Sequence, residues 1–180
     1  MAETEWPWQY DFPPFFTIQP HLETQNKQIS AWQSLILCFF KNNKSYILDI
    51  REAQNSPLFN NSKINRKLPQ DGILKILEHL HKSGHAEPCD KSKNSQLHYR
   101  WFIYWHTLDE WASMIYDWAQ GNGMINTVCT LYELVSGDNT VNEEFYGLDM
   151  GILMKALRTL EMQKKAEIIM FDDNEGVKFL

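Results

Sequence analysis

Apolar residues recur at intervals of three and four along four stretches of the chain, which is typical of helices that bury one face. The stripes of the first and third stretches comprise Ile29, Trp32, Leu35, Ile36, Phe39 and Phe40, and Leu108, Trp111, Met114, Ile115 and Trp118. The second and fourth stripes comprise Ile73, Ile76, Leu77 and Leu80, and Ile152, Leu153, Ala156, Leu157 and Leu160. Pro69 suits the first turn of the second helix, and Gly84 suits its C-terminal cap.

Short β-prone runs lie between these helices. Residues 46–50 and 128–131 each predict a strand that is followed by a further helical stretch. Two hairpins are also predicted, one with strands 85–90 and 96–104 around the polar loop 91–95, the other with strands 166–171 and 177–180 around the loop 172–176. Each loop contains Asn or Gly, which tolerate the positive φ of a tight turn.

The chain repeats itself at a spacing of about eighty residues. Nine residues of the first half have a similar residue 80 positions later. They are Leu68, Ile73, Leu77, Leu80, Ala86, Glu87, Asn94, Leu97 and Tyr99. Their counterparts, in the same order, are Leu148, Leu153, Leu157, Leu160, Ala166, Glu167, Asn174, Val177 and Phe179. At an offset of 79, Ile29, Trp32, Ser34 and Ile36 recur as Leu108, Trp111, Ser113 and Ile115. A nearly constant offset through successive elements indicates a duplication.

Each half therefore reads helix, strand, helix, helix and two-stranded wing, which is the winged-helix plan. We predict an α+β, mainly helical fold with two tandem winged-helix domains, at residues 22–105 and 106–180, preceded by an extended arm of prolines and aromatics at residues 1–21. The join near Trp105 and His106 leaves almost no linker.

The arm concentrates six aromatic rings and four of the seven prolines within twenty residues. Proline removes backbone donors and fixes φ, so we expect an extended, polyproline-like or turn conformation. Its rings then lie either as a strap over the chain's own core or in pockets of another subunit, and we favour docking because aromatic anchors are typical of binding hot spots. The candidate docking residues are Trp6, Pro7, Trp8, Tyr10, Phe12, Pro13, Pro14, Phe15 and Phe16.

Charge is unevenly distributed along the chain. Residues 1–106 carry twelve Lys and Arg against ten Asp and Glu, a net of +2, whereas residues 107–180 carry five against thirteen, a net of −8. A phosphate backbone requires cations, so this distribution argues against a nucleic-acid partner. It favours a basic protein partner for the C-terminal half, although acidic residues also serve solubility.

No catalytic or metal-binding motif is present. The chain lacks a Gly-rich phosphate loop, a Gly-x-Ser-x-Gly elbow and a His-Glu-x-x-His helix. The spacing of His79, His81, His85 and Cys89 does not bring four ligands together, so we predict no metal and no cofactor. Cys38, Cys89 and Cys129 indicate reduced thiols in a cytosolic protein, with Cys38 packed on an apolar helix. We predict a protein that is not an enzyme.

The chain resembles the vacuolar protein-sorting-associated protein 25 family, the small subunit of the ESCRT-II complex. The resemblance begins with the arm, from Trp6-Pro7-Trp8-Gln9-Tyr10 to Gln19-Pro20, and covers essentially the whole chain. It continues through Glu52-Ala53-Gln54, Ser56-Pro57-Leu58-Phe59-Asn60-Asn61, Arg66-Lys67-Leu68-Pro69, Asp90-Lys91-Ser92-Lys93, Thr130-Leu131-Tyr132-Glu133-Leu134, Gly147-Leu148-Asp149 and Gly176-Val177-Lys178-Phe179. Pro88-Cys89 stands where a stretch richer in Glu and Lys is expected.

The resemblance implies a non-catalytic subunit in the sorting of ubiquitinated membrane cargo into multivesicular bodies. It implies two copies per complex, docked through their arms on the GLUE-domain subunit and on the other large winged-helix subunit. It also implies a second domain that recruits and activates a myristoylated ESCRT-III subunit. The implied location is the cytoplasm, peripherally on endosomal membranes and bound to the membrane only through the complex.

We expect the ESCRT-III partner to present a basic amphipathic helix to carboxylates of the second domain. The candidates lie in predicted loops and edges: Asp138, Glu143, Glu144, Asp172, Asp173 and Glu175. The alternative function is a winged-helix nucleic-acid-binding transcriptional regulator, which a steep loss of duplex affinity with salt would reveal.

Overall fold

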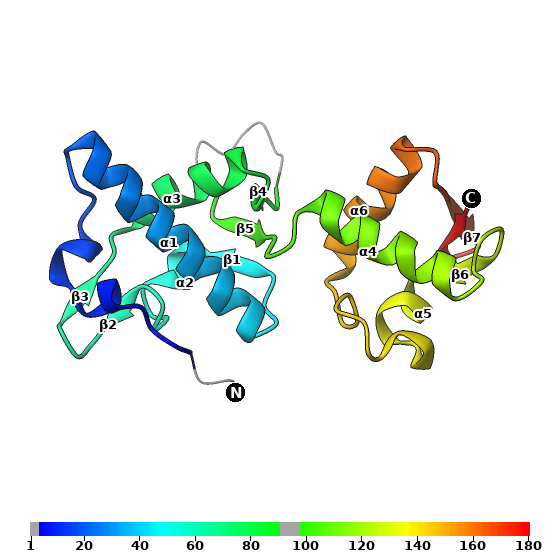
Figure 1. The fold of residues 1–180 in the computed structure, drawn as a ribbon, viewed down its shortest axis with the longest axis horizontal. Coiled ribbons are helices and arrows are strands. Elements are labelled where there is room, and N and C mark those ends of the chain that lie inside the picture. Colours follow the sequence, from blue (N-terminus) through cyan, green and yellow to red (C-terminus); the bar gives the residue numbers. More distant parts are fainter. Residues whose placement is uncertain (1–3, 91–97) are drawn as a thin grey trace. The chain divides into compact units, whose positions relative to one another are not determined.

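A computed structural model describes residues 4–90 and 98–180 (Figure 1). The chain forms two compact units, Met1–Trp105 and His106–Leu180. No helix of the described residues is both long and apolar enough to cross a membrane.

The first unit combines three α-helices with a three-stranded sheet in its described part. Its elements are α1 (Leu22–Asn42), β1 (Ile47–Asp49), α2 (Ile50–Ala53), β2 (Asn60–Asn61), β3 (Arg66–Lys67), α3 (Gln70–Lys82), β4 (Ala86–Pro88) and β5 (Arg100–Ile103). The sheet has the order β1-β5-β4, and both pairings are antiparallel. Strands β2 and β3 form a separate small hairpin between α2 and α3.

The second unit follows the same order of elements. It contains α4 (Leu108–Gly121), β6 (Val128–Thr130), α5 (Leu131–Ser136), the 3-10 turn η3 (Asp138–Thr140), α6 (Met150–Met162), β7 (Ala166–Phe171) and β8 (Asn174–Phe179). Its sheet has the order β6-β8-β7, again antiparallel throughout. The predicted mixture of helix and sheet, with the helices in the predicted stretches, is confirmed.

The repeated apolar residues occupy matching places in the two cores. Trp32 and Trp111 are both buried, and so are the repeated pairs farther along the chain. These pairs are Ile36 and Ile115, Leu68 and Leu148, Ile73 and Leu153, Leu77 and Leu157, and Leu80 and Leu160. Each helix must bury one apolar stripe, and this requirement keeps the spacing of the buried residues the same in the two halves.

The spacing between equivalent residues of the two units changes at the second strand of each hairpin, β5 and β8. Ile103 pairs with Ala86 in the first unit and Phe179 pairs with Ala166 in the second, so these two equivalent residues are 76 rather than 80 positions apart. Our match of Tyr99 to Phe179 is wrong, since Tyr99 is exposed while Phe179 is buried. Asn94 and Leu97 lie outside the described residues. The longer loop of the first hairpin accounts for the shift.

The second hairpin turns more tightly than predicted. Strand β8 begins at Asn174, so Asp172 and Asp173 alone form the turn, and Asp172 takes the positive φ of 45°. Gly176 lies within β8 instead of the loop. A Cβ at this position would lie 2.8 Å from the Phe171 ring and 3.0 Å from the Cys129 carbonyl oxygen, so close packing explains the glycine.

Candidate partner-binding surfaces

The N-terminal segment adopts the turn conformation rather than an extended one. It forms two 3-10 turns, η1 (Trp8–Asp11) and η2 (Pro13–Phe16), each preceded by a residue with extended backbone angles. Pro13 opens η2, where its missing N–H costs no hydrogen bond. These turns give the aromatic side chains fixed positions.

Three of the rings belong to the chain's own core. Tyr10, Phe15 and Phe16 are buried, and the rings of Phe15 and Phe16 both contact Trp32 of α1. The Gln28 side chain fastens the same segment, because its Nε2 donates to the carbonyl oxygens of Phe15 at 2.9 Å and Thr17 at 2.8 Å. Our preference for docking in another subunit is therefore corrected for these three residues, which form a strap over the first unit.

The remaining aromatic candidates face solvent. Trp8 is 72% exposed and Phe12 is 48% exposed, whereas Trp6, at 37%, stacks on Tyr10 with ring centroids 4.0 Å apart. Pro13 and Pro14 are also exposed, and Pro7 is half-buried. The rings of Trp8 and Phe12 lie 5.8 Å apart and line a mostly apolar hollow of about 490 Å³ with residues of α1 that include Thr24, Gln28 and Ala31. Exposed apolar surface of this kind is typical of a partner contact.

The β2–β3 hairpin also contacts η1. Asn61 is buried, and its Nδ2 donates to the Tyr10 carbonyl oxygen at 2.7 Å. Lys63 Nζ lies 3.1 Å from one Asp11 carboxylate oxygen, and Asn61 Nδ2 also donates to the other at 3.3 Å. These two bonds hold the pKa of Asp11 below its ordinary value. Asn61 and Lys63 leave no local pattern in the sequence that would mark them, because their contacts join positions about fifty apart.

The second unit brings together only part of the predicted acidic group. Asp173 and Glu175 line a hollow of about 440 Å³ at the wing together with Tyr132, Met150 and Met170. Asp172 is the neighbouring exposed residue of the turn. The three apolar side chains are 70%, 48% and 63% exposed, in that order. Acidic and apolar side chains therefore lie together on one surface. The charge pattern of the sequence indicated the acidic residues of this surface but not Tyr132, Met150 and Met170.

The other three carboxylates come from the connection between α5 and α6. Asp138 begins η3, and Glu143 and Glu144 follow it. Glu144 Oε2 lies 2.5 Å from His106 Nε2, and Glu110 Oε2 lies 3.7 Å from the other ring nitrogen. Glu144 thus contacts His106 within the second unit, whereas Asp172, Asp173 and Glu175 are exposed residues of the wing hairpin itself.

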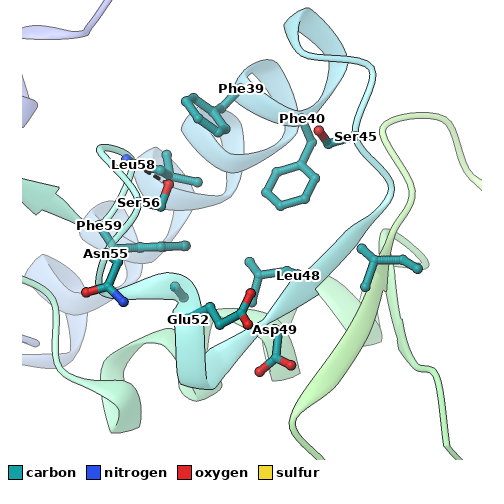
Figure 2. A pocket seen from close by; sticks show the side chains of 12 residues that line it. Phe39, Phe40, Ser45, Leu48, Asp49, Glu52, Asn55, Ser56, Leu58 and Phe59 are labelled. Carbon is teal, nitrogen blue, oxygen red and sulfur yellow. Dashed lines mark hydrogen bonds between the residues drawn. The ribbon is translucent and has the colours of Figure 1, made fainter.

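A further hollow of about 540 Å³ lies between the end of α1, β1, α2 and the following loop (Figure 2). Buried Phe40, Leu48, Leu58 and Phe59 form its apolar wall. Asp49 and Glu52 are the ionisable groups among its lining residues, and the bond from Arg51 to Asp49 lowers the pKa of that carboxyl. Ser45 and Ser56 supply the hydroxyl groups among its lining residues, and no hydrogen bond between described residues joins either hydroxyl to Asp49 or Glu52.

The rings of His81 and His85 and the backbone amide of Cys89 each lie within hydrogen-bonding distance of a carbonyl oxygen. His81 Nδ1 lies 2.8 Å from the Ala86 carbonyl oxygen, and His85 Nδ1 lies 2.7 Å from that of Tyr104. The Cys89 amide bonds to the Arg100 carbonyl oxygen across the hairpin. Within residues 4–90 and 98–180 there is no group of three or more His, Cys, Asp or Glu that could hold a metal ion.

The sequence also matches a family of known proteins. The family described as ESCRT-II complex subunit matches residues 9–149, which is more than half of the chain. The chain belongs to the ESCRT-II complex subunit family. The match runs from Gln9 in η1 to Asp149, which caps α6, and so includes η1 from its second residue onward, the whole of η2 and the β2–β3 hairpin.

Curated relatives extend this result to nearly the whole chain. The chain is 51% identical over 175 residues to vacuolar protein-sorting-associated protein 25 of Xenopus laevis, which covers 97% of this chain and 98% of that protein. It is 50% identical to the Homo sapiens protein over 97% of both chains, and 47% identical to the Drosophila melanogaster protein over 99% of both. The predicted family is therefore confirmed.

Solved structures of the ESCRT-II family share the fold. A crystal structure of subunit VPS25 of the endosomal trafficking complex ESCRT-II superposes with a TM-score of 0.83 at 34% identity, over 96% of this chain and 97% of that chain. The VPS22/VPS25/VPS36 complex contains a chain that superposes with a TM-score of 0.82 at 36% identity, over 97% and 98%. The chain thus shares its mixed helix-and-sheet fold with subunit VPS25 of that complex.

Proposed function

We propose that the chain is a non-catalytic subunit of an ESCRT-II complex in the endosomal sorting of ubiquitinated cargo into multivesicular bodies. It docks through its N-terminal segment on the two large subunits, two copies to a complex, and its second unit recruits and activates an ESCRT-III subunit. It reaches endosomal membranes only through that complex. The observation that carries the proposal is the pair of exposed rings, Trp8 and Phe12. They belong to a segment whose Tyr10, Phe15 and Phe16 are buried.

The N-terminal segment suits docking because its shape is set before a partner arrives. Phe15 and Phe16 fix η2 in the core, and Asn61 and Lys63 fix η1, so the exposed rings lose little conformational freedom on binding. Large apolar rings at such a site are typical hot-spot anchors.

Replacing Trp8 and Phe12 with Ala tests this docking site. Each ring contributes about 2–4 kcal/mol as a hot-spot anchor, so the double variant is expected to lose more than about 100-fold in affinity for the purified VPS22 and VPS36 subunits. The control is Met162→Ala, which removes an apolar side chain that is 86% exposed on α6 of the other unit. Binding that survives loss of both rings would place docking elsewhere on the chain.

The wing of the second unit suits the ESCRT-III contact. A basic amphipathic helix can bury its apolar stripe against Tyr132, Met150 and Met170, while its cations meet Asp173 and Glu175. Most of the affinity then comes from the apolar centre, because an exposed ion pair contributes about 0–1 kcal/mol.

Two variants of the full chain separate these contributions in binding to the N-terminal helix of an ESCRT-III subunit. Tyr132→Ala with Met170→Ala is expected to weaken binding at every salt concentration. Asp173→Lys with Glu175→Lys is expected to slow association at low salt only. The matched control is Asp138→Lys with Glu143→Lys, in the α5–α6 connection. If the control slows association and the wing variants do not, the partner helix lies on that connection instead.

A further inference from the structure

The connection between the second and third helices differs sharply in charge between the two units. Residues 54–69 of the first unit contain Lys63, Arg66 and Lys67 and no carboxylate, whereas residues 137–149 of the second unit contain four carboxylates and no cation. The first connection also folds into the β2–β3 hairpin, while the second contains only the short turn η3. The hairpin is therefore a basic feature of the first unit alone.

Two of the three hairpin cations make no ion pair with the described residues. Lys63 is paired with Asp11, but Arg66 makes only a 3.0 Å hydrogen bond to the carbonyl oxygen of Asn65, and both Arg66 and Lys67 are exposed on β3. The backbone at Asn65, with φ of 53°, turns the chain so that these two cations follow the tip of the hairpin directly. Their positive charges are thus available to another molecule.

The hairpin is continuous with the N-terminal docking segment. Asn61 Nδ2 donates to the Tyr10 carbonyl oxygen, Lys63 contacts Asp11, and β3 packs against η2. Trp8 and Phe12, which flank Tyr10 and Asp11 in the sequence, are the exposed rings of the same segment. Arg is enriched with Trp at the centres of protein interfaces, where its planar guanidinium binds carboxylates with two parallel hydrogen bonds.

We propose that the β2–β3 hairpin is a second contact element for the docking partner, in which Arg66 and Lys67 bind carboxylates that lie beside the partner's apolar site for Trp8 and Phe12. The inference rests on the proposed docking of the N-terminal segment and adds the chemistry of the receiving surface, which is acidic at one side of an apolar site. Opposite charges at the edge of an interface mainly accelerate association and select the partner, while the rings slow dissociation.

The test measures association of the full chain with the purified VPS22 and VPS36 subunits as a function of salt. The variant Arg66→Glu with Lys67→Glu is expected to slow association about tenfold at about 50 mM salt and to approach the unmodified rate at about 500 mM. Arg66→Lys with Lys67→Arg keeps both charges and is expected to retain the unmodified rate to within a few-fold. The control Lys75→Glu with Lys82→Glu makes the same charge change on α3 and is expected to have little effect.

The outcomes distinguish this inference from the docking proposal. If the Trp8→Ala, Phe12→Ala variant fails to bind but charge reversal on the hairpin changes no rate, the rings dock and the hairpin inference is overturned. If neither variant changes binding, both proposals fail. If the hairpin variant binds the subunits normally but loses retention on vesicles that contain anionic lipid, the cations serve a membrane and the inference is again overturned.

Discussion

The ring of Phe15 lies flat on the indole of Trp32, with centroids 4.3 Å apart and planes 3° apart. The Phe15 carbonyl oxygen also accepts a 2.9 Å hydrogen bond from Trp32 Nε1. The N-terminal segment thus completes the core around the first tryptophan of the repeat. In the second unit His106, which precedes the N-cap residue Thr107 of α4, has a related place, because its ring lies perpendicular to that of Trp111 with centroids 4.9 Å apart.

Phe15→Ala is expected to destabilise the chain, whereas Phe12→Ala is not. Phe15 is buried between Trp32 and Phe16, so its removal leaves a cavity and costs about 3–5 kcal/mol. Phe12 is exposed, and its removal is expected to change the free energy of unfolding by less than about 0.5 kcal/mol. Urea unfolding of the two variants checks this, and equal midpoints would show that the strap contributes nothing to the core.

Gln28→Leu is expected to loosen the N-terminal segment. The Gln28 side chain accepts a 3.0 Å hydrogen bond from the Gln19 amide and donates to the Phe15 and Thr17 carbonyl oxygens. Leaving such buried groups unpaired costs about 1–3 kcal/mol. Limited proteolysis should cut near residues 14–20 faster in this variant than in Gln33→Leu, a change on the same helix outside the network. Equal cutting rates would count against the fastening role.

Two glycines are expected to respond oppositely to alanine. At Gly176 the added methyl group would press on the Phe171 ring and the Cys129 carbonyl oxygen, so Gly176→Ala should destabilise the chain by about 1–3 kcal/mol. At Gly121, at the end of α4, the added carbon would lie more than 4 Å from every atom of the described residues except the nearby backbone of its own helix. Gly121→Ala should therefore stabilise by about 0.4–1 kcal/mol. Thermal unfolding compares the midpoints of the two variants. An unchanged midpoint for Gly176→Ala would mean that β8 can shift to make room for the added methyl group.

The thiols should differ in reactivity. Burial, reinforced by the nearby Glu133 carboxylate, raises the pKa of the Cys129 thiol to about 11, so only about one molecule in a thousand is thiolate at pH 8. Cys38 is exposed, which corrects our expectation that it packs in the core. Iodoacetamide at pH 8 should modify Cys38 within minutes and Cys129 only after unfolding. Rapid labelling of Cys129 in the folded chain would contradict its burial.

Several elements could be predicted because their signal is local. Helices α1, α3, α4 and α6 each bury one face, so their apolar residues recur at helical spacing and match between the two halves. The exposure of Asp172 and Asp173 was also predictable, since turns expose polar residues, whereas the predicted loop residue Glu175 lies in β8. The hairpin register was not predictable, because strands that pair across a loop of unknown length can shift without altering their own residue pattern.

The sequence by itself determined the duplicated helical plan, the opposite charges of the two halves and the presence of an aromatic N-terminal segment. Only the tertiary structure decided which rings of that segment are buried, with Phe15 and Phe16 in the core and Trp8 and Phe12 in solvent. The physical reason is that all of these rings have the same preference for burial, so composition cannot separate them. The space around Trp32 accepts the rings of Phe15 and Phe16, and the turns η1 and η2 direct the others outward.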